Sequence, residues 1–569
     1  MLTGYDSMKY GQLQNFMGTW LVKEGVITSA QLEEALNDQK LHKGSKGFLG
    51  KVLVQMGHCT EDDIARVMAK RSGVPYVSLE NYDIDIAAVA TLPVEALKRY
   101  RALPISFKED KLFVAMQHPN DIIALDDLRI LTGYDIQQVV APDTELDAAI
   151  EKYSRANMDF DHSEVEETVV EEIAGEADDS SARPAVRLVN MIITQAVNAK
   201  ASDIHIEAYE RYVRVRFRID GVLHDIMQPP QRMQASIVSR IKVMSNMNIA
   251  ERRIPQDGRV SMRIEGRTID IRVATLPAAF GERVTMRLLD RSSRIITLEE
   301  LGVVPEMLKK YKHALDIPYG FILVTGPTGS GKSTTLYASL AAVDRVEKNV
   351  ITVEDPIEYR MDEVNQIQIN PKAGLTFASG LRSILRSDPD IIMVGEIRDK
   401  ETARIAIESA LTGHLVFSTL HTNDAAGAIS RLTEMEIEPF LTASSLVCVL
   451  AQRLARVLCP HCKRSHPMSR QELLDIVADF PLVEGEQQVT LYRAVGCMRC
   501  NKTGYRGRIG IYEMLFVNEK IQRLTLERRS ASEIKQAAID NGMVMLRRDG
   551  LNKVKQGITS LEEIMRVVV

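Results

Sequence analysis

The pattern of apolar and polar positions changes near residue 300. Before it, apolar and polar residues alternate in three runs, which predicts strands with one buried face. These runs are Tyr212–Arg218, Arg267–Val273 and Arg283–Leu289. After it, apolar runs such as Phe321–Thr325 and Val350–Val353 are continuous, which is typical of parallel strands buried on both faces. We therefore expect an α/β multidomain protein.

Two weak copies of one helical unit precede these regions. Residues 16–39 and 48–71 share apolar and glycine positions, and each predicts a short helix, a glycine turn and a second helix. The second helices are predicted to begin near Thr28 and Thr60, each followed three residues later by a side chain that can complete a capping arrangement. Residues 1–75 are therefore interpreted as a small helical module.

The next stretch divides into a domain, a linker and a second domain. Strand and helix signals alternate over residues 76–153, which predicts a small α/β domain. Residues 156–182 carry ten Asp and Glu and no Lys or Arg, a composition typical of a solvated linker, which we place at 154–183. The alternating strands then fall in a domain at 184–295, opened by a helix over Ala185–Lys200. Its polar face is rich in arginine, but the aromatic residues that stack on nucleic-acid bases are sparse.

The length and composition of the chain argue against several classes of protein. The chain has 569 residues, which predicts about three or four domains. The net charge of −6 argues against a nucleic-acid coat, so no nucleic-acid partner is expected. No apolar run reaches membrane-spanning length and no secretory signal is visible. Six cysteines, four of them in two C-x-x-C pairs, suit a reducing compartment, so we expect a cytoplasmic protein.

The stretch from Gly326 to Ser333 reads G-x-x-x-x-G-K-S between a predicted strand and a predicted helix, which is the context of a phosphate-binding loop. Lys332 is expected to reach the β- and γ-phosphates of ATP, and the Ser333 hydroxyl to bind Mg²⁺. The predicted nucleotide-binding residues are Gly326, Pro327, Thr328, Gly329, Ser330, Gly331, Lys332, Ser333 and Thr334.

Acidic and histidine side chains follow the other buried strands of this core, which we place at 301–569. Glu354 and Glu358 come after the strand at 350–353, Glu396 after the run that begins at 390, and His421 after the run that begins at 413. Ligands of parallel sheets gather at the carboxyl ends of the strands. These four residues are therefore predicted to converge on the phosphate-binding loop.

Two cysteine pairs predict a metal centre within residues 456–503. Cys459 and Cys462 are separated from Cys497 and Cys500 by 34 residues. Four thiolates suit a closed, structural, tetrahedral zinc site. The long intervening loop is expected to carry a helix over Ser469–Phe480. The other two cysteines, Cys59 and Cys448, are interpreted as ordinary buried residues, and residues 520–569 as helices.

Together these motifs closely resemble the assembly ATPases of bacterial type II secretion and type IV pili (the GspE and PilB group). The resemblance is strong over 184–569 and looser over 1–153. The matching stretches are Ala201–Glu207, Arg253–Arg259, the phosphate-binding loop, Ile351–Glu358, Gly395–Asp399, Ser418–Asn423 and both cysteine pairs. The resemblance implies a RecA-like ATPase core after a PAS-like middle domain, and a homohexamer peripherally associated with the inner membrane.

The resemblance also implies roles for individual residues. Arg272 and Arg287 would face the phosphates from the middle domain as arginine fingers. Glu358 would position the attacking water, with Glu396 as the alternative; Glu396 would also hold Mg²⁺ through water, and His421 would sense the γ-phosphate. Further arginine candidates are Arg382, Arg386 and Arg398.

The implied activity is ATP hydrolysis that drives pilin or pseudopilin assembly through an inner-membrane platform protein and other assembly proteins. The N-terminal extension and the four cysteines favour assembly over retraction. Two alternatives stay open: a nucleotide-gated scaffold with little turnover, and an ATPase for DNA uptake or transfer. The motifs do not distinguish a pilus motor from a type II secretion motor.

The repeat in residues 1–75 also resembles the MshE-like module that binds cyclic di-GMP in some of these ATPases. That pattern opens with an Arg-Leu-Gly triplet, but here Phe16 and Phe48 occupy the arginine positions. Arginine can pair bidentately with guanine, whereas phenylalanine can only stack. We therefore expect weak or absent cyclic di-GMP binding.

Overall fold

The computed structural model describes residues 17–41, 49–80, 82–108, 111–158, 179–264, 266–290 and 294–568. The chain forms two compact units, Met1–Ser292 and Ser293–Val569. None of the helices in these described ranges combines the length and the apolar character needed to cross a membrane.

The first unit begins with the predicted helical repeat. Residues 17–23 are helical, and three further helices follow: α2 (Ser29–Leu41), α3 (Leu49–Gln55) and α4 (Glu61–Ser72). The predicted capping at Thr60 is confirmed, because its hydroxyl accepts the Asp63 N–H while the Asp63 carboxylate accepts the Thr60 N–H. Phe16 and Phe48 lie outside the described residues.

A small α/β layer follows the repeat. Its strands are β1 (Ala102–Lys108), β2 (Lys111–Met116) and β3 (Asp135–Val140), in the order β1-β2-β3 with β1 antiparallel and β3 parallel to β2. Its helices are α5 (Ile86–Val89), α6 (Val94–Tyr100), α7 (Ile122–Thr132) and α8 (Asp143–Met158). This matches the alternation of strands and helices predicted for residues 76–153.

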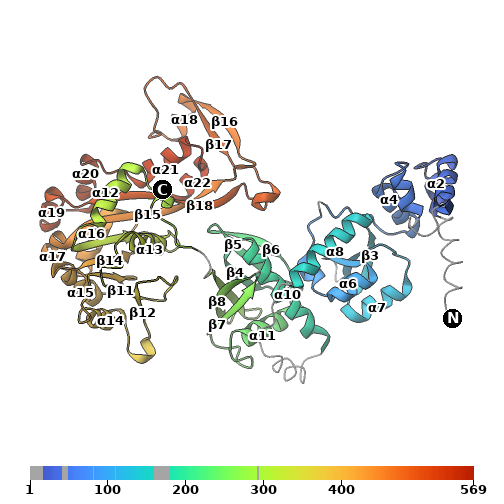
Figure 1. Ribbon diagram of the computed structural model, residues 1–569, viewed down its shortest axis with the longest axis horizontal. Helices are drawn as coiled ribbons and strands as arrows, with labels where there is room; N and C mark the ends of the chain where they lie inside the picture. Colours follow the sequence, from blue (N-terminus) through green and yellow to red (C-terminus); the bar gives the residue numbers. More distant parts are fainter. Residues whose placement is uncertain are drawn as a thin grey trace. The chain divides into compact units, whose positions relative to one another are not determined.

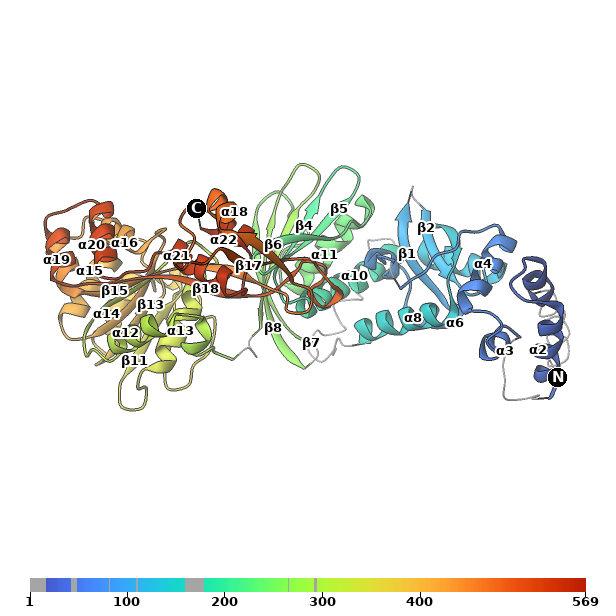
Figure 2. The ribbon, with the colours of Figure 1, turned by 90° about the horizontal axis from the view of Figure 1, so that it is seen from above.

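The alternating strands form a six-stranded antiparallel sheet in the order β6-β5-β4-β9-β8-β7, drawn in green in Figure 2. The strands are β4 (Ala201–Ala208), β5 (Val213–Ile219), β6 (Val222–Met227), β7 (Gln256–Ile264), β8 (Arg267–Leu276) and β9 (Arg283–Asp290). Helices η1 (Gln231–Met233), α10 (Asp179–Asn198) and α11 (Gln234–Met244) accompany it. Buried residues alternate with more exposed ones along β8, so the one-sided pattern is confirmed.

The helix that opens this sheet starts earlier than predicted. α10 begins at Asp179 and α8 ends at Met158, so both edges of the predicted acidic linker are helical, and its centre lies outside the described residues. α10 also joins the two layers, because one continuous apolar core extends from Leu79 to Met286. The Arg187 guanidinium on α10 donates to the Ala90 carbonyl of the small α/β layer at 2.9 Å.

The second unit, coloured yellow-green to red in Figure 1, is built on a seven-stranded sheet in the order β12-β11-β13-β14-β10-β15-β18. All neighbours are parallel except β15 and β18. The strands are β10 (Gly320–Thr325), β11 (Val350–Glu354), β12 (Asn365–Gln368), β13 (Ile391–Val394), β14 (Leu415–Leu420), β15 (Leu446–Leu458) and β18 (Tyr505–Phe516). The parallel strands predicted from continuous apolar runs are thus confirmed.

Helices cover both faces of this sheet. Ile322 and Val324 of β10 pack with α12 (Pro305–Leu315) and α13 (Lys332–Ala342), whereas Phe321 and Leu323 pack in a separate core with helices that follow later in the chain. Those helices are α14 (Phe377–Ile384), α15 (Lys400–Leu411), α16 (Ala425–Glu434), α19 (Glu519–Leu526), α20 (Ala531–Asp540), α21 (Leu546–Lys555) and α22 (Leu561–Val567). The second unit also contains α17 (Pro439–Ser445) and the short turns η2 (Glu299–Leu301) and η3 (Pro371–Ala373).

A hairpin interrupts the chain between β15 and β18. It consists of β16 (Arg464–Ser469), α18 (Arg470–Ile476) and β17 (Gln488–Arg493), and it ends in η4 (Met498–Cys500). The predicted helix over Ser469–Phe480 is present but shorter, because the β-branched Val477 takes an extended backbone after Ile476. The Ser469 hydroxyl caps its first turn by accepting the Glu472 N–H.

Candidate functional site

The predicted phosphate-binding loop lies between β10 and α13. Gly326 has a φ of 149°, and a Cβ there would lie 2.5 Å from the Gln452 carbonyl oxygen. Gly331 has a φ of 90° and immediately precedes the first turn of α13. Such backbone conformations favour glycine. The loop therefore presents main-chain groups at a helix N-terminus, the arrangement that favours an anion.

Lys332 is folded onto this loop. Its ammonium donates to the Gly326 carbonyl at 2.9 Å and the Pro327 carbonyl at 3.1 Å. Burial lowers the pKa of Lys332, and the nearby Glu396 carboxylate partly opposes the shift. The Ser330 hydroxyl is buried and, within the described part of the chain, has no hydrogen-bond partner. A bound anion would accept hydrogen bonds from the Lys332 ammonium in place of these carbonyls.

Gln452, which the sequence motifs did not identify, holds the loop from β15. Its amide nitrogen donates to the Ser330 carbonyl at 2.7 Å, and its amide oxygen accepts the Thr335 hydroxyl at 2.8 Å. The side chain is 2% exposed. A polar residue within the otherwise apolar stretch 446–452 of β15 was the signal that could have indicated this role.

Glu396 and His421 are brought together at the strand ends, as predicted. The Glu396 carboxylate pairs with Arg398 and lies 3.5 Å from His421 Nε2. The hydrogen bond to Glu396 raises the pKa of Arg398. The loop after β14 is attached to the end of β10, because the Thr325 hydroxyl accepts the Thr422 N–H at 2.9 Å. The segment carrying His421 is thereby fixed beside the phosphate-binding loop.

Glu354 does not join this cluster, so that part of the prediction is wrong. Its side chain is buried and accepts hydrogen bonds from Thr352 at 2.6 Å, from Gln366 at 3.1 Å and from Tyr337. Burial raises the pKa of Glu354, and these hydrogen bonds oppose the shift. The last residue of β11 points into the protein because β11 is buried on both faces. Glu358 follows in the turn after β11 and is exposed.

Arg382 and Arg386 make contacts within and next to α14. Arg382 on α14 forms an ion pair with Glu401 on α15. Arg386 donates to the Arg382 carbonyl at 2.9 Å and to the Ser383 hydroxyl at 3.2 Å. These contacts use both guanidinium groups within the α14–α15 region.

In the first unit, the predicted arginines stand in one row across the six-stranded sheet. Arg272 of β8 is directly opposite Arg287 of β9 on one side and Arg259 of β7 on the other. Directly opposed residues of antiparallel strands share a face. The row continues to Asp203 of β4, whose carboxylate accepts the Arg287 Nε at 3.1 Å. A row of like charges repels itself, so this face is suited to an anion.

Two acids on β4 are buried beneath this arginine face. Glu207 pairs with Arg216 at 2.6 Å and with Arg283 at 3.2 Å, and Asp203 pairs with both Arg287 and Arg218. The carboxylates are each 9% exposed, whereas the Arg287 side chain is 58% exposed. The acids therefore orient arginine side chains whose outer surface stays accessible within this unit.

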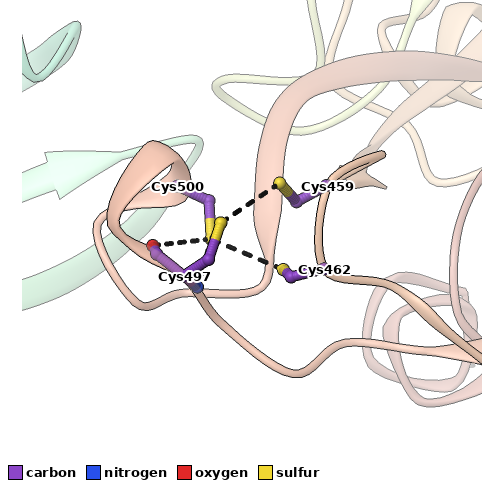
Figure 3. Close-up of side chains that lie close together, drawn as sticks. All are labelled: Cys459, Cys462, Cys497 and Cys500. Atoms are coloured by element: carbon purple, nitrogen blue, oxygen red, sulfur yellow. Dashed lines mark hydrogen bonds between the residues drawn. The ribbon is translucent and has the colours of Figure 1, made fainter.

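Four cysteines meet at the end of β15. The sulfur of Cys459 lies 3.9 Å from that of Cys497, and the sulfur of Cys500 lies 3.8 Å from those of Cys462 and Cys497. Figure 3 shows the four side chains pointing toward one another. Tetrahedral zinc with Zn–S bonds of 2.3 Å requires sulfur separations of about 3.8 Å, whereas a disulfide requires about 2 Å. The geometry therefore fits a four-thiolate metal site.

Backbone amides complete this centre. The Gly496 N–H donates to the Cys462 sulfur at 3.3 Å, and the Gly504 N–H donates to the Cys500 sulfur at 3.2 Å. Such hydrogen bonds stabilise thiolate ligands. The other two cysteines differ: Cys448 is buried and Cys59 is half-buried, and burial raises their pKa values to about 12 and about 11.

Family models match most of the chain. A model described as Type II/IV secretion system protein matches residues 178–566. A model described as the MshEN domain matches residues 72–159, which is the small α/β layer rather than the helical repeat.

Individual relatives are similar over long stretches. The chain is 44% identical over 563 residues to the type IV pilus assembly ATPase PilB of Myxococcus xanthus, covering 96% of this chain and 98% of that protein. It is 50% identical over 386 residues to the type II secretion system ATPase E of Vibrio cholerae, covering 68% and 75%. The solved structure of the ATPase DotB of Yersinia pseudotuberculosis is similar in fold, with a TM-score of 0.50, 20% identity, and coverage of 67% of this chain and 92% of that chain.

Proposed function

The chain belongs to the type II/IV secretion system protein family, and we propose that it is a motor that hydrolyses ATP to assemble a type IV pilus. The observation that carries the proposal is the near full-length similarity to a type IV pilus assembly ATPase, 98% of which is covered. The phosphate-binding loop, the acids at the strand ends and the arginine face supply the parts that phosphoryl transfer needs.

ATP would bind at the loop between β10 and α13. The N–H groups of Gly326–Thr334 would surround the phosphates, and the Lys332 ammonium would exchange its carbonyl partners for phosphate oxygens. The Ser333 hydroxyl and, through water, Glu396 are suited to hold Mg²⁺, which would neutralise phosphate charge. Gln452 would keep the loop in shape when no nucleotide is bound.

Hydrolysis needs a group that positions water and groups that stabilise the transferred phosphoryl. We assign the first role to Glu358 and keep Glu396 as the alternative. His421, next to Glu396, would respond to the γ-phosphate. Arg272 and Arg287 would act as arginine fingers in a homohexamer and stabilise the charge that develops on the phosphoryl group.

The mechanical output is proposed from the family. Changes in charge on hydrolysis would change the conformation of the motor, which would act on an inner-membrane platform protein so that pilin subunits enter the filament. The motor would sit in the cytoplasm, peripherally bound to the inner membrane. The four-thiolate site would hold a structural Zn²⁺ that fixes the hairpin between β15 and β18.

A second candidate is the motor of a type II secretion system, favoured by the 50% identity to the Vibrio cholerae protein over the core. A strain lacking the gene separates the two, since loss of surface pili supports the first and loss of exported enzymes with intact pili supports the second. Rescue by wild type but not by Lys332→Ala is expected in either case.

Turnover by the purified full chain tests the enzymatic part. We expect Mg²⁺-dependent phosphate release that the platform protein stimulates. Release that only DNA stimulates would favour a DNA uptake or transfer motor. Nucleotide binding without release under any of these conditions would favour a scaffold.

A further inference from the structure

Tyr337 links the helix of the phosphate-binding loop to the segment that carries Glu358. It lies on α13, which starts at Lys332, and its side chain is 2% exposed. Its hydroxyl donates to the Glu354 carboxylate at the end of β11. The same oxygen accepts the N–H of Glu358 at 3.2 Å and the N–H of Tyr359 at 3.4 Å.

These bonds use the full capacity of the hydroxyl. A tyrosine hydroxyl has one proton to donate and two lone pairs to accept with, and each has a partner here. The three bonds join one helix to both ends of the turn 354–359. The Tyr337 and Tyr359 rings also meet edge to face, with centroids 5.4 Å apart. The turn is thus attached to α13 at a single buried point.

The acceptor of the Tyr337 proton is itself fixed. Glu354 is held by Thr352 and Gln366, so its carboxylate cannot turn away without breaking buried hydrogen bonds. Gln366 also donates to the Tyr359 carbonyl at 2.9 Å. Gln366 thus joins the first and last residues of the turn, and Tyr337 connects this hydrogen-bond network to α13.

We propose that Tyr337 is a positioning residue for ATP hydrolysis, which sets Glu358 in register with the phosphate-binding loop. This inference rests on the proposed role of Glu358. When nucleotide binds at the N-terminus of α13, any shift of that helix reaches the Glu358 backbone through the Tyr337 hydroxyl. Because Tyr337 is 2% exposed, we assign it a positioning role rather than a catalytic one.

The test is the split between kcat and KM in Tyr337→Phe. Phenylalanine keeps the packing and the ring contact but leaves the Glu358 N–H without its acceptor. We expect kcat for ATP to fall about 10- to 100-fold, the size expected for a misplacement near 1 Å, with KM within about 2-fold of wild type. An unchanged kcat, or a change confined to KM, would overturn the inference.

The chain offers a matched control in Tyr311→Phe. Tyr311 lies on α12 and is 1% exposed. Its hydroxyl forms a hydrogen bond of 2.7 Å with the hydroxyl of Ser339, which lies on α13 like Tyr337. Both variants lose one buried hydroxyl, Tyr337 on α13 itself and Tyr311 bonded to it, and the melting temperature of each variant measures the accompanying loss of stability. Only Tyr337→Phe should lower kcat. An equal fall of kcat in Tyr311→Phe would mean that destabilisation of α13 alone lowers turnover, and it would overturn the inference.

A double-mutant cycle with Glu358→Gln shows whether Tyr337 acts through Glu358. Residual phosphate release is followed with radiolabelled ATP over hours. If Tyr337→Phe has little further effect in the Glu358→Gln background, the inference is supported. If it lowers turnover by the same factor in both backgrounds, the inference is wrong.

The cycle also separates the two levels of the proposal. Wild-type turnover in Glu358→Gln would contradict both the assigned role of Glu358 and the inference. If the Glu358→Gln variant is inactive but the Tyr337→Phe variant is fully active, only the inference about Tyr337 is contradicted. Should Tyr337→Phe fail to fold, Glu354→Met, which keeps the side-chain length but removes the carboxylate acceptor, must show the same kcat loss for the inference to stand.

Discussion

The two large sheets of this protein carry their charged side chains in different ways. Along β5 of the antiparallel sheet, buried and partly exposed residues alternate, whereas every residue of β10 and β14 in the parallel sheet is buried. The antiparallel sheet can therefore display arginines across a whole face. The fully buried strands of the parallel sheet can expose charged side chains only beyond their ends.

Because their charged groups are arranged differently, the two sheets can contribute differently to one reaction. On the arginine face, several cations share two buried acids, so the charge is spread over many groups. Near the strand ends, single side chains carry the charge, such as Lys332 at the start of α13 and Glu396 after β13. We expect graded losses from substitutions on the face and nearly complete losses from substitutions at the strand ends.

The largest effect is expected in the parallel sheet's phosphate-binding loop, from Lys332→Ala. Phosphate release should fall by at least about 100- to 1,000-fold, because the β- and γ-phosphates lose their main side-chain partner. Far-ultraviolet circular dichroism should be unchanged, since the ammonium donates to loop carbonyls and no strand or helix hydrogen bond is lost with it. Wild-type phosphate release from a normally folded variant would refute the assignment of the loop.

Arg272→Ala and Arg287→Ala probe the arginine face. Each should lower kcat about 10- to 100-fold, less than a single arginine finger contributes elsewhere because two arginines share the charge, with a smaller effect on ATP binding. Steady-state kinetics and nucleotide titration of each variant measure the two quantities.

A matched control lies on the same sheet. Arg214 on β5 forms a bidentate pair with Asp225, at 2.8 and 2.7 Å, and Arg214→Ala should leave kcat nearly unchanged. If either Arg272→Ala or Arg287→Ala binds ATP much more weakly yet turns over normally at saturation, that arginine is a binding residue, and its assigned role is wrong.

The antiparallel edge of the second sheet should depend on zinc rather than on ATP. We expect about one equivalent of zinc per chain from elemental analysis, bound by Cys459, Cys462, Cys497 and Cys500. Chelation should lower the melting temperature by about 5–10 °C, because the β15–β18 connection loses its metal. The parallel strands should be unaffected, since backbone hydrogen bonds hold them together. Less than about half an equivalent in protein never exposed to chelator would contradict the site.

The smallest effect is expected for cyclic di-GMP. The helical repeat has Phe16 and Phe48 where the binding pattern has arginines, and a bidentate arginine contact is worth about 1–3 kcal/mol. Two such losses should weaken binding by roughly 30-fold or more. Isothermal titration of the full chain should show weak or no binding. A submicromolar dissociation constant would mean that this motor responds to the second messenger.

Local patterns in the sequence determined much of the architecture. Period-two alternation predicted β5, β8 and β9, continuous apolar runs predicted the parallel strands, and the Thr60 cap was visible three residues ahead of its partner. The glycines of the phosphate-binding loop belong to the same class, because the conformation each must adopt depends on its own backbone. Local steric and hydrogen-bonding rules suffice for such features.

Only the tertiary structure decided which polar side chains point into the site. Glu354 ends β11 and Glu358 follows it, yet the first is buried among hydrogen-bond donors and the second is exposed. Gln452 and Tyr337 act on segments more than 100 and about 20 residues away in the chain. Strand register, which sets the cross-strand neighbours of Arg272, is likewise settled by pairing between distant strands. Burial and register depend on the packing of whole layers, so no window of sequence contains them.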